Sequence, residues 1–217
     1  MNQRIVEPTK FDSFGNVGCD DAMARLDNFA AKLEAEPGTA GYLIVYPQRN
    51  GLLGRYQRFF DSMKDHLVMT RGIQPERLIV LGGDYRDQLT IEFWLVPKGA
   101  TLQIPAADLN YQGALKFDEG FADYSGRGAP SLWTYDMCEV EGVYFAAFAE
   151  QLRVKPNTKG HIIVHLERGK PISRYRTMAR LLRNEMVKEQ PVDNRSLVIR
   201  SGKPRRGPSV ELWIVPI

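Results

Sequence analysis

The sequence is poor in the side chains from which catalytic and metal sites are usually built. Its 217 residues include two cysteines and three histidines, and neither cysteine has a histidine or a second cysteine at zinc-ligand spacing. No serine stands in a nucleophile-elbow motif, and no Gly-Lys pattern for cradling phosphate is present. We therefore expect a protein that is not an enzyme and has neither a metal site nor a cofactor.

Long apolar runs are missing as well. No stretch approaches the ~18 residues that a membrane-spanning helix needs. The N-terminal residues MNQRIVEPTK contain no apolar segment of the kind found in a signal peptide. We expect no transmembrane segment, and a chain that is either cytoplasmic or trimmed of its signal peptide.

What the chain does contain is one module twice. The segment IEFWLVP at 91–97 returns as VELWIVP at 210–216, which is 119 positions later. At this shift residues 19–97 align with 138–216 without a gap, and 20 of the 79 positions are identical. Unrelated segments would share on the order of five identities. The tripeptide KFD recurs at a shift of only 106, so the second module carries 13 additional residues, which lie within 119–137.

Hydrophobic periodicity predicts the elements of each module. Apolar runs between Gly and Pro predict strands, whereas spacings of three and four predict helices that cover a sheet. In the first module we expect strands at 4–12, 41–47, 77–83 and 89–97 and helices at 20–37 and 55–71. The fold class is therefore α+β, with two tandem β-α-β-α-β-β modules, each a mixed sheet with helices packed on one face. We place the first module at 1–100, a linker at 101–115, and the second module at 116–217 with an inserted loop at 119–137.

With this order of elements, the first module resembles the OmpA-like C-terminal domain. The resemblance rests on a helix ending in proline, a second helix ending near KDxL, a Gly-Ile pair, an Arg-Leu pair and a glycine. In this sequence these are Pro37, KDHL at 64–67, Gly72-Ile73, Arg77-Leu78 and Gly82. The resemblance implies a bacterial cell envelope protein in the periplasm or otherwise outside the cytoplasm.

The chain departs from the family where the family binds the diaminopimelate of peptidoglycan. The family has an Asp shortly after the second strand and an Arg at the start of the last strand. Here PQRN at 47–50 follows the second strand, and QLT at 88–90 and GPS at 207–209 precede the last strands. Without these charged partners we expect peptidoglycan binding to be lost.

Positive charge is concentrated in the second module. Residues 1–97 hold 11 basic and 13 acidic side chains, and residues 98–217 hold 18 and 13. Arg176, Arg180 and Arg183 form a stripe on a predicted helix, which suits either an anionic partner or a solvated helix face. Arginines in the loops are further candidates. Arg49, Arg55, Arg168 and Arg174 recur in both modules, either as structural residues that hold the loop to helix or strand carbonyls or as an anion site at the helix N-terminus. Arg86, Arg205 and Arg206, in the loop before the last strand, are candidates to reach a nearby anion.

The inserted loop supplies aromatic candidates for a partner contact. Phe121, Tyr124, Trp133 and Tyr135 stand among glycines and serines, and the alternative is that the loop covers its own module. Cys19 and Cys138 occupy matching repeat positions, either as a disulfide or as two packed thiols.

Three classes of function remain open. The first is a non-enzymatic binding or structural protein of the envelope, a subunit or accessory of a larger assembly with a protein partner or an anionic ligand. The second, with nucleic acid as the less favoured partner, is a polyanion binder that uses the basic face. The third is an enzyme with an unrecognised site between the modules, for which raised pKa values of a buried Glu92 and Glu211 would be the supporting observation.

Overall fold

The computed structural model describes residues 7–49, 51–104, 113–121 and 143–217, apart from the side chain of Phe121. The chain divides into two compact units, Met1–Gly51 with Phe59–Leu109 and Leu52–Arg58 with Asn110–Ile217. Residues 52–58, which include the start of the helix Leu53–Asp65, are grouped with the second unit, and Leu53 packs against the hydrophobic core of that unit.

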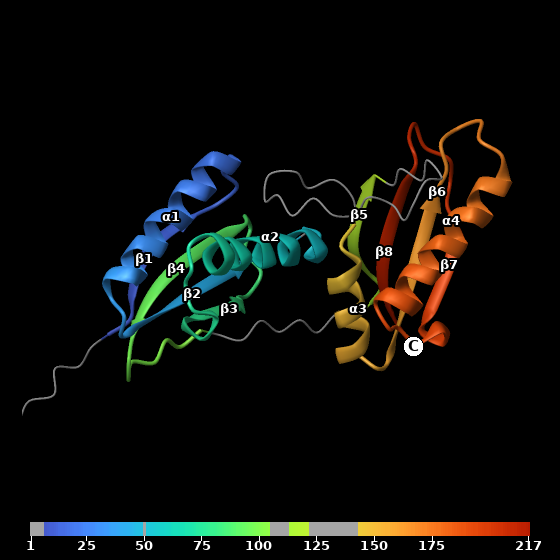
Figure 1. The fold of residues 1–217 in the computed structure, drawn as a ribbon. Helices are drawn as coiled ribbons and strands as arrows, with labels where there is room; N and C mark the ends of the chain where they lie inside the picture. The colour runs from blue at the N-terminus through green and yellow to red at the C-terminus, as the bar shows by residue number, and fades with distance from the viewer. Residues whose placement is uncertain (1–6, 50, 105–112, 122–142) are drawn as a thin grey trace, which may run out of the picture. The chain divides into compact units, whose positions relative to one another are not determined.

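Both modules contain the same elements in the same order (Figure 1). The first consists of β1 Thr9–Phe14, α1 Cys19–Ala35, β2 Thr39–Tyr46, α2 Leu53–Asp65, β3 Leu78–Gly82 and β4 Thr90–Pro97. The second consists of β5 Leu115–Phe121, α3 Phe145–Val154, β6 Thr158–His165, α4 Ile172–Asn184, β7 Leu197–Ser201 and β8 Ser209–Pro216. The predicted α+β fold with two similar modules is confirmed.

The two sheets have matching topology. The strand order is β1-β4-β2-β3 in one and β5-β8-β6-β7 in the other. In each sheet the edge strand β3 or β7 is parallel to its neighbour, β2 or β6, and the remaining pairs are antiparallel. Both first strands carry a bulge between the Lys and Asp of the KFD tripeptide. This shared irregularity confirms that the first strands align at the shift of 106.

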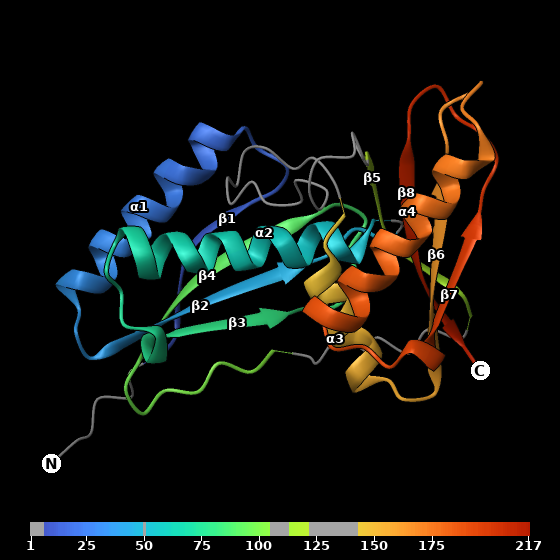
Figure 2. The same cartoon turned by 45° about the vertical axis from the view of Figure 1, so that its right-hand side comes forward.

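The helices of each module lie over one face of its sheet (Figures 1 and 2). The apolar stripe of α1 is fully buried, and Phe29 stacks on Phe93 of β4 with ring centroids 4.9 Å apart. A Cβ on Gly41 of β2 would lie 2.8 Å from Leu33 Cδ1, and one on Gly160 would lie 2.7 Å from Leu152 Cδ1. The repeated glycine therefore allows the first helix of each module to approach the sheet closely.

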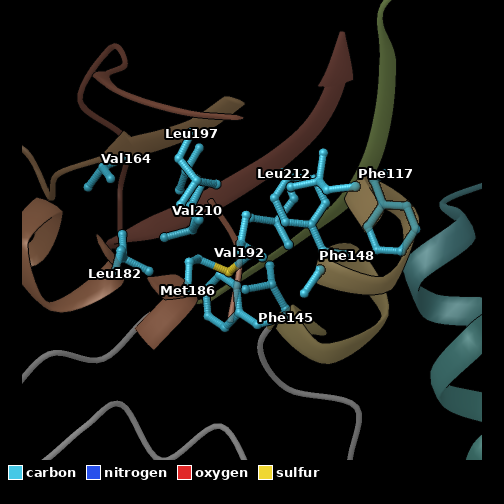
Figure 3. Close-up of a cluster of buried hydrophobic side chains, with 14 of the residues drawn as sticks. Phe117, Phe145, Phe148, Val164, Leu182, Met186, Val192, Leu197, Val210 and Leu212 are labelled. Carbon is cyan, nitrogen blue, oxygen red and sulfur yellow. The ribbon is translucent and has the colours of Figure 1, made fainter. Parts of the chain in front are cut away.

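The core of the second module is built from the equivalent positions (Figure 3). Helix α3 contributes Phe145 and Phe148, and α4 with the π-helical turn that follows it contributes Leu182 and Met186. These side chains pack against inward-facing residues of the sheet such as Leu212. Each module thus has a hydrophobic core on one face of its sheet, and the residues between the inward-facing positions lie on the other face.

Candidate functional site

The most extensive polar cluster in each module surrounds a buried glutamate on its last strand. Glu92 of β4 is 4% exposed and Glu211 of β8 is 6% exposed. Because side chains alternate along a strand, these glutamates lie on the face opposite Phe93 and Leu212, which point toward the helices. A carboxylate is costly to bury unless charged groups and hydrogen bonds compensate its charge. The neighbouring residues therefore decide whether each glutamate is ionised or protonated.

In the first module four side chains reach Glu92. Lys10 Nζ lies 2.9 Å and Arg86 Nη1 3.2 Å from Oε1. Trp94 Nε1 donates to Oε2 at 2.9 Å, and the hydroxyl of Tyr46 donates to the same oxygen at 3.4 Å. Burial alone would raise the pKa of Glu92, but the hydrogen bonds from Lys10, Trp94 and Arg86 outweigh it, and the pKa is lowered.

The second module repeats this arrangement around Glu211. Trp213 Nε1 donates to Oε2 at 2.9 Å, Lys116 Nζ lies 3.2 Å from Oε1, and Arg205 also donates to Oε1. Burial again opposes ionisation, and the hydrogen bonds from Trp213, Arg205 and Lys116 lower the pKa of Glu211 to about 2. Both glutamates are therefore ionised at neutral pH. This is the opposite of the raised pKa expected for an enzyme that uses this pair.

One member of the cluster differs between the modules. In the first module Arg86 stacks on Tyr46, and the Cζ atom of Arg86 lies 3.3 Å from the centroid of the tyrosine ring. In the second module His165 replaces Tyr46. His165 Nδ1 lies 2.9 Å from the carbonyl oxygen of Lys203, and Nε2 lies 3.5 Å from Glu211 Oε1. Both rings pack on a repeated glycine, because a Cβ on Gly83 would lie 2.3 Å from Tyr46 and one on Gly202 would lie 2.4 Å from His165. The substitution therefore keeps the shape of the cluster.

Two arginines expected to be available for an anion are thus engaged internally. Arg86 and Arg205 neutralise the buried glutamates, as do Lys10 and Lys116. Sequence reasoning missed this role, although the signal was present. The glutamate, the arginine, the lysine and the tryptophan all recur at equivalent repeat positions.

The arginine stripe on α4 is only partly free. Met178 and Leu182 bury the opposite face of the helix, and Arg176 and Arg180 are exposed. Neither forms an ion pair with any residue that the structure describes. Arg183 differs, because it is half-buried and donates through Nη1 to Asn194 Oδ1. The free part of the stripe is therefore Arg176 and Arg180.

The loop arginines of the two modules also behave differently. Arg49 Nε lies 3.2 Å from Asp87 Oδ1, so this side chain binds a carboxylate, whereas the structural interpretation expected it to bind helix or strand carbonyls. Arg55, Arg168 and Arg174 are exposed and form no ion pair with the described part of the chain. Toward the residues that the structure describes, these three side chains form no hydrogen bond either.

The strongest difference between the modules is a one-directional change of charge. At the shift of 119, six acidic residues of the first module are replaced by Lys or Arg in the second, and no Lys or Arg is replaced by an acid. The six pairs are Glu34/Arg153, Glu36/Lys155, Asp61/Arg180, Glu76/Arg195, Asp84/Lys203 and Asp87/Arg206. Arg180, Arg195, Lys203 and Arg206 are exposed and have no ion-pair partner among described residues. The second module thus presents uncompensated positive charge.

A further buried carboxylate lies in the second unit. Asp118 of β5 is fully buried and accepts backbone hydrogen bonds from Tyr144 at 2.8 Å and Glu119 at 2.9 Å. Arg58 of the same unit lies 3.2 Å away. Burial raises the pKa of Asp118 to about 6, although these donors and Arg58 oppose the shift. Its counterpart in the first module, Asp12, is half-buried and pairs with Arg25.

Most aromatic residues of the expected contact loop lie outside the part of the chain that the structure describes. Tyr124, Trp133, Tyr135 and Cys138 are outside the described residues, and Phe121 ends β5 without a described side chain. Among the residues that are described, no cluster of His, Cys, Asp and Glu has the geometry to hold a metal ion. Within the same part of the chain, no helix is both long and apolar enough to span a bilayer.

Comparison with known proteins does not distinguish between the three classes of function. No protein-family model matches this chain, and no curated protein matches it at a significant level. Function must therefore be argued from the repeated fold and from the residues in which the two modules differ.

Proposed function

We propose that this chain is a non-enzymatic protein of the bacterial cell envelope that binds an acidic partner protein through its second module, as a subunit or accessory of a larger assembly. The observation that carries the proposal is the replacement of six acids by bases, with none in the reverse direction. Random reversals of charge would run both ways. The single direction of these reversals supports adaptation of the second module to a negatively charged surface.

The position of the new charges supports a binding surface rather than internal ion pairing. Arg176 and Arg180 lie on the solvent side of α4, and Arg195, Lys203 and Arg206 are exposed in the segments that flank β7. Exposed charges of one sign that have no internal partner steer an oppositely charged protein and hold it in register. The first module lacks this property and serves as the scaffold.

Two considerations favour a protein partner over peptidoglycan. The diaminopimelate-binding Asp and Arg of the OmpA-like family have no counterparts at the matching positions. Arg86 and Arg205, the nearest arginines, are engaged by Glu92 and Glu211. The location in the envelope rests on the sequence resemblance to that family.

The proposal is tested with the full chain and two probes of equal charge, a Glu-rich peptide and a single-stranded DNA oligonucleotide. Fluorescence anisotropy should show the peptide binding at low ionic strength, with affinity falling as salt is added because exposed charges are screened. DNA should bind more weakly. Absence of peptide binding at low salt would contradict the proposal, and tighter binding of DNA with a steep salt dependence would favour the polyanion class instead.

A further inference from the structure

We infer that Arg168 and Arg206 form a binding site for a carboxylate side chain of the partner, an inference that rests on the proposed function. The two residues come from the loop after β6 and the loop before β8. Both side chains are exposed, and neither forms an ion pair with a described residue.

The first module shows what these two positions do when they carry opposite charges. Arg49 occupies the position of Arg168, and Asp87 occupies that of Arg206. Arg49 Nε lies 3.2 Å from Asp87 Oδ1, so the positions are within ion-pairing distance of one another. The pair is solvent-exposed, with side-chain exposures of 68% and 94%.

The backbone that sets this distance is the same in both modules. Arg49 N donates to the carbonyl of Arg86 at 3.0 Å, and Arg168 N donates to the carbonyl of Arg205 at 3.0 Å. The return bonds are also alike, from Arg86 N to Pro47 O and from Arg205 N to Leu166 O, both at 2.9 Å. The second module therefore holds two arginines at positions where the first module holds an ion pair.

Two like charges at such positions repel unless an anion lies between them. The nearest carboxylate in the loop, Glu167, already lies 3.6 Å from Lys170. Lys203, exposed in the loop before β8, adds a further positive charge in place of Asp84. The two loops thus present positive charge to solvent.

The chemistry of the missing group is given by Asp87. In the first module the carboxylate is part of the same chain, and in the second module we assign the equivalent carboxylate to the partner. A guanidinium donates two parallel hydrogen bonds to a planar carboxylate, so two arginines present a matched set of donors to an Asp or Glu side chain. An acidic segment of the partner protein fits this requirement.

The test uses R206D, which gives the second module the residue that the first module has at that position. A fluorescein-labelled, Glu-rich peptide should bind the full-length variant about tenfold more weakly, corresponding to ~1.4 kcal/mol. R195E makes the same change of charge outside the two loops and should weaken binding by less than about threefold. D87R builds the arginine pair in the first module and should add a second bound peptide. In the unaltered protein, the Nε–H signals of Arg168 and Arg206 should shift together on peptide addition.

The outcomes separate the site from the proposed function. If the peptide binds the unaltered protein but R206D and R195E weaken it equally, the charges act only as a general field and the paired site is refuted. If the unaltered protein binds no acidic peptide, the proposed function itself fails. Binding of single-stranded DNA that is lost in R206D, without binding of the peptide, would overturn the assignment of a carboxylate ligand. Circular dichroism of R206D checks that the fold is retained.

Discussion

Replacing Glu211 by Gln tests whether the buried cluster is held together by an ionised carboxylate. The pKa of Glu211 is about 2 in the folded protein, against 4.5 for an unperturbed glutamate. A shift of one pKa unit corresponds to about 1.4 kcal/mol, so the ionised form contributes at most ~3 kcal/mol to the free energy of unfolding. Because the folded pKa is depressed, this contribution is present above about pH 4.5 and is lost as the pH falls toward about 2.

Urea unfolding of the wild type and E211Q, followed by circular dichroism at several pH values, measures this contribution. Hydrogen exchange of β8 assigns the effect to the second module. We expect E211Q to be less stable by about 2–3 kcal/mol at pH 7, and the difference to shrink at acid pH. E92Q should behave in the same direction, because the pKa of Glu92 is also lowered. A difference that does not change with pH, or a more stable E211Q, would refute the reasoning.

Three further predictions follow from the described contacts. Replacing Arg176, Arg180 and Arg183 together by Gln should change the free energy of unfolding by no more than about 1 kcal/mol, measured by urea denaturation, because none of them is in the core. Arg77→Ala should cost about 2 kcal/mol in the same assay, since its guanidinium donates to three main-chain carbonyls, whereas the control Arg71→Ala removes a surface ion pair and should cost less than about 1 kcal/mol. Calorimetric titration with diaminopimelate should show no saturable binding at millimolar concentrations; a saturable isotherm would mean that the site had been rebuilt from other residues.

The order of elements and most core positions could be predicted because they depend on local patterns. The stripe of α1 at Leu26, Phe29 and Leu33 repeats with helical spacing, and all three side chains are buried. The repeat itself fixed the correspondence between modules. Element ends were predicted less well. Helix α1 spans Cys19–Ala35, whereas the sequence predicted a helix at 20–37.

The polar contacts could not be predicted in the same way because they join residues far apart in the sequence. Lys10 reaches Glu92 only because β1 pairs with β4 in a register that includes a bulge. Arg77 was assigned to a family motif, yet its side chain joins the end of α1 to the start of β2 through the carbonyls of Leu33, Glu36 and Thr39. Such roles depend on sheet register and loop geometry, which hydrophobic periodicity does not contain.

We propose that the positive charge gained by the second module forms its partner-binding surface. The most direct test restores the acidic residues of the first module through R180D, R195E, K203D and R206D in one full-length variant. The wild type should capture an acidic protein from detergent-solubilised bacterial envelopes, and the variant should keep its circular dichroism spectrum and lose that protein. Equal capture by a folded variant would contradict the account.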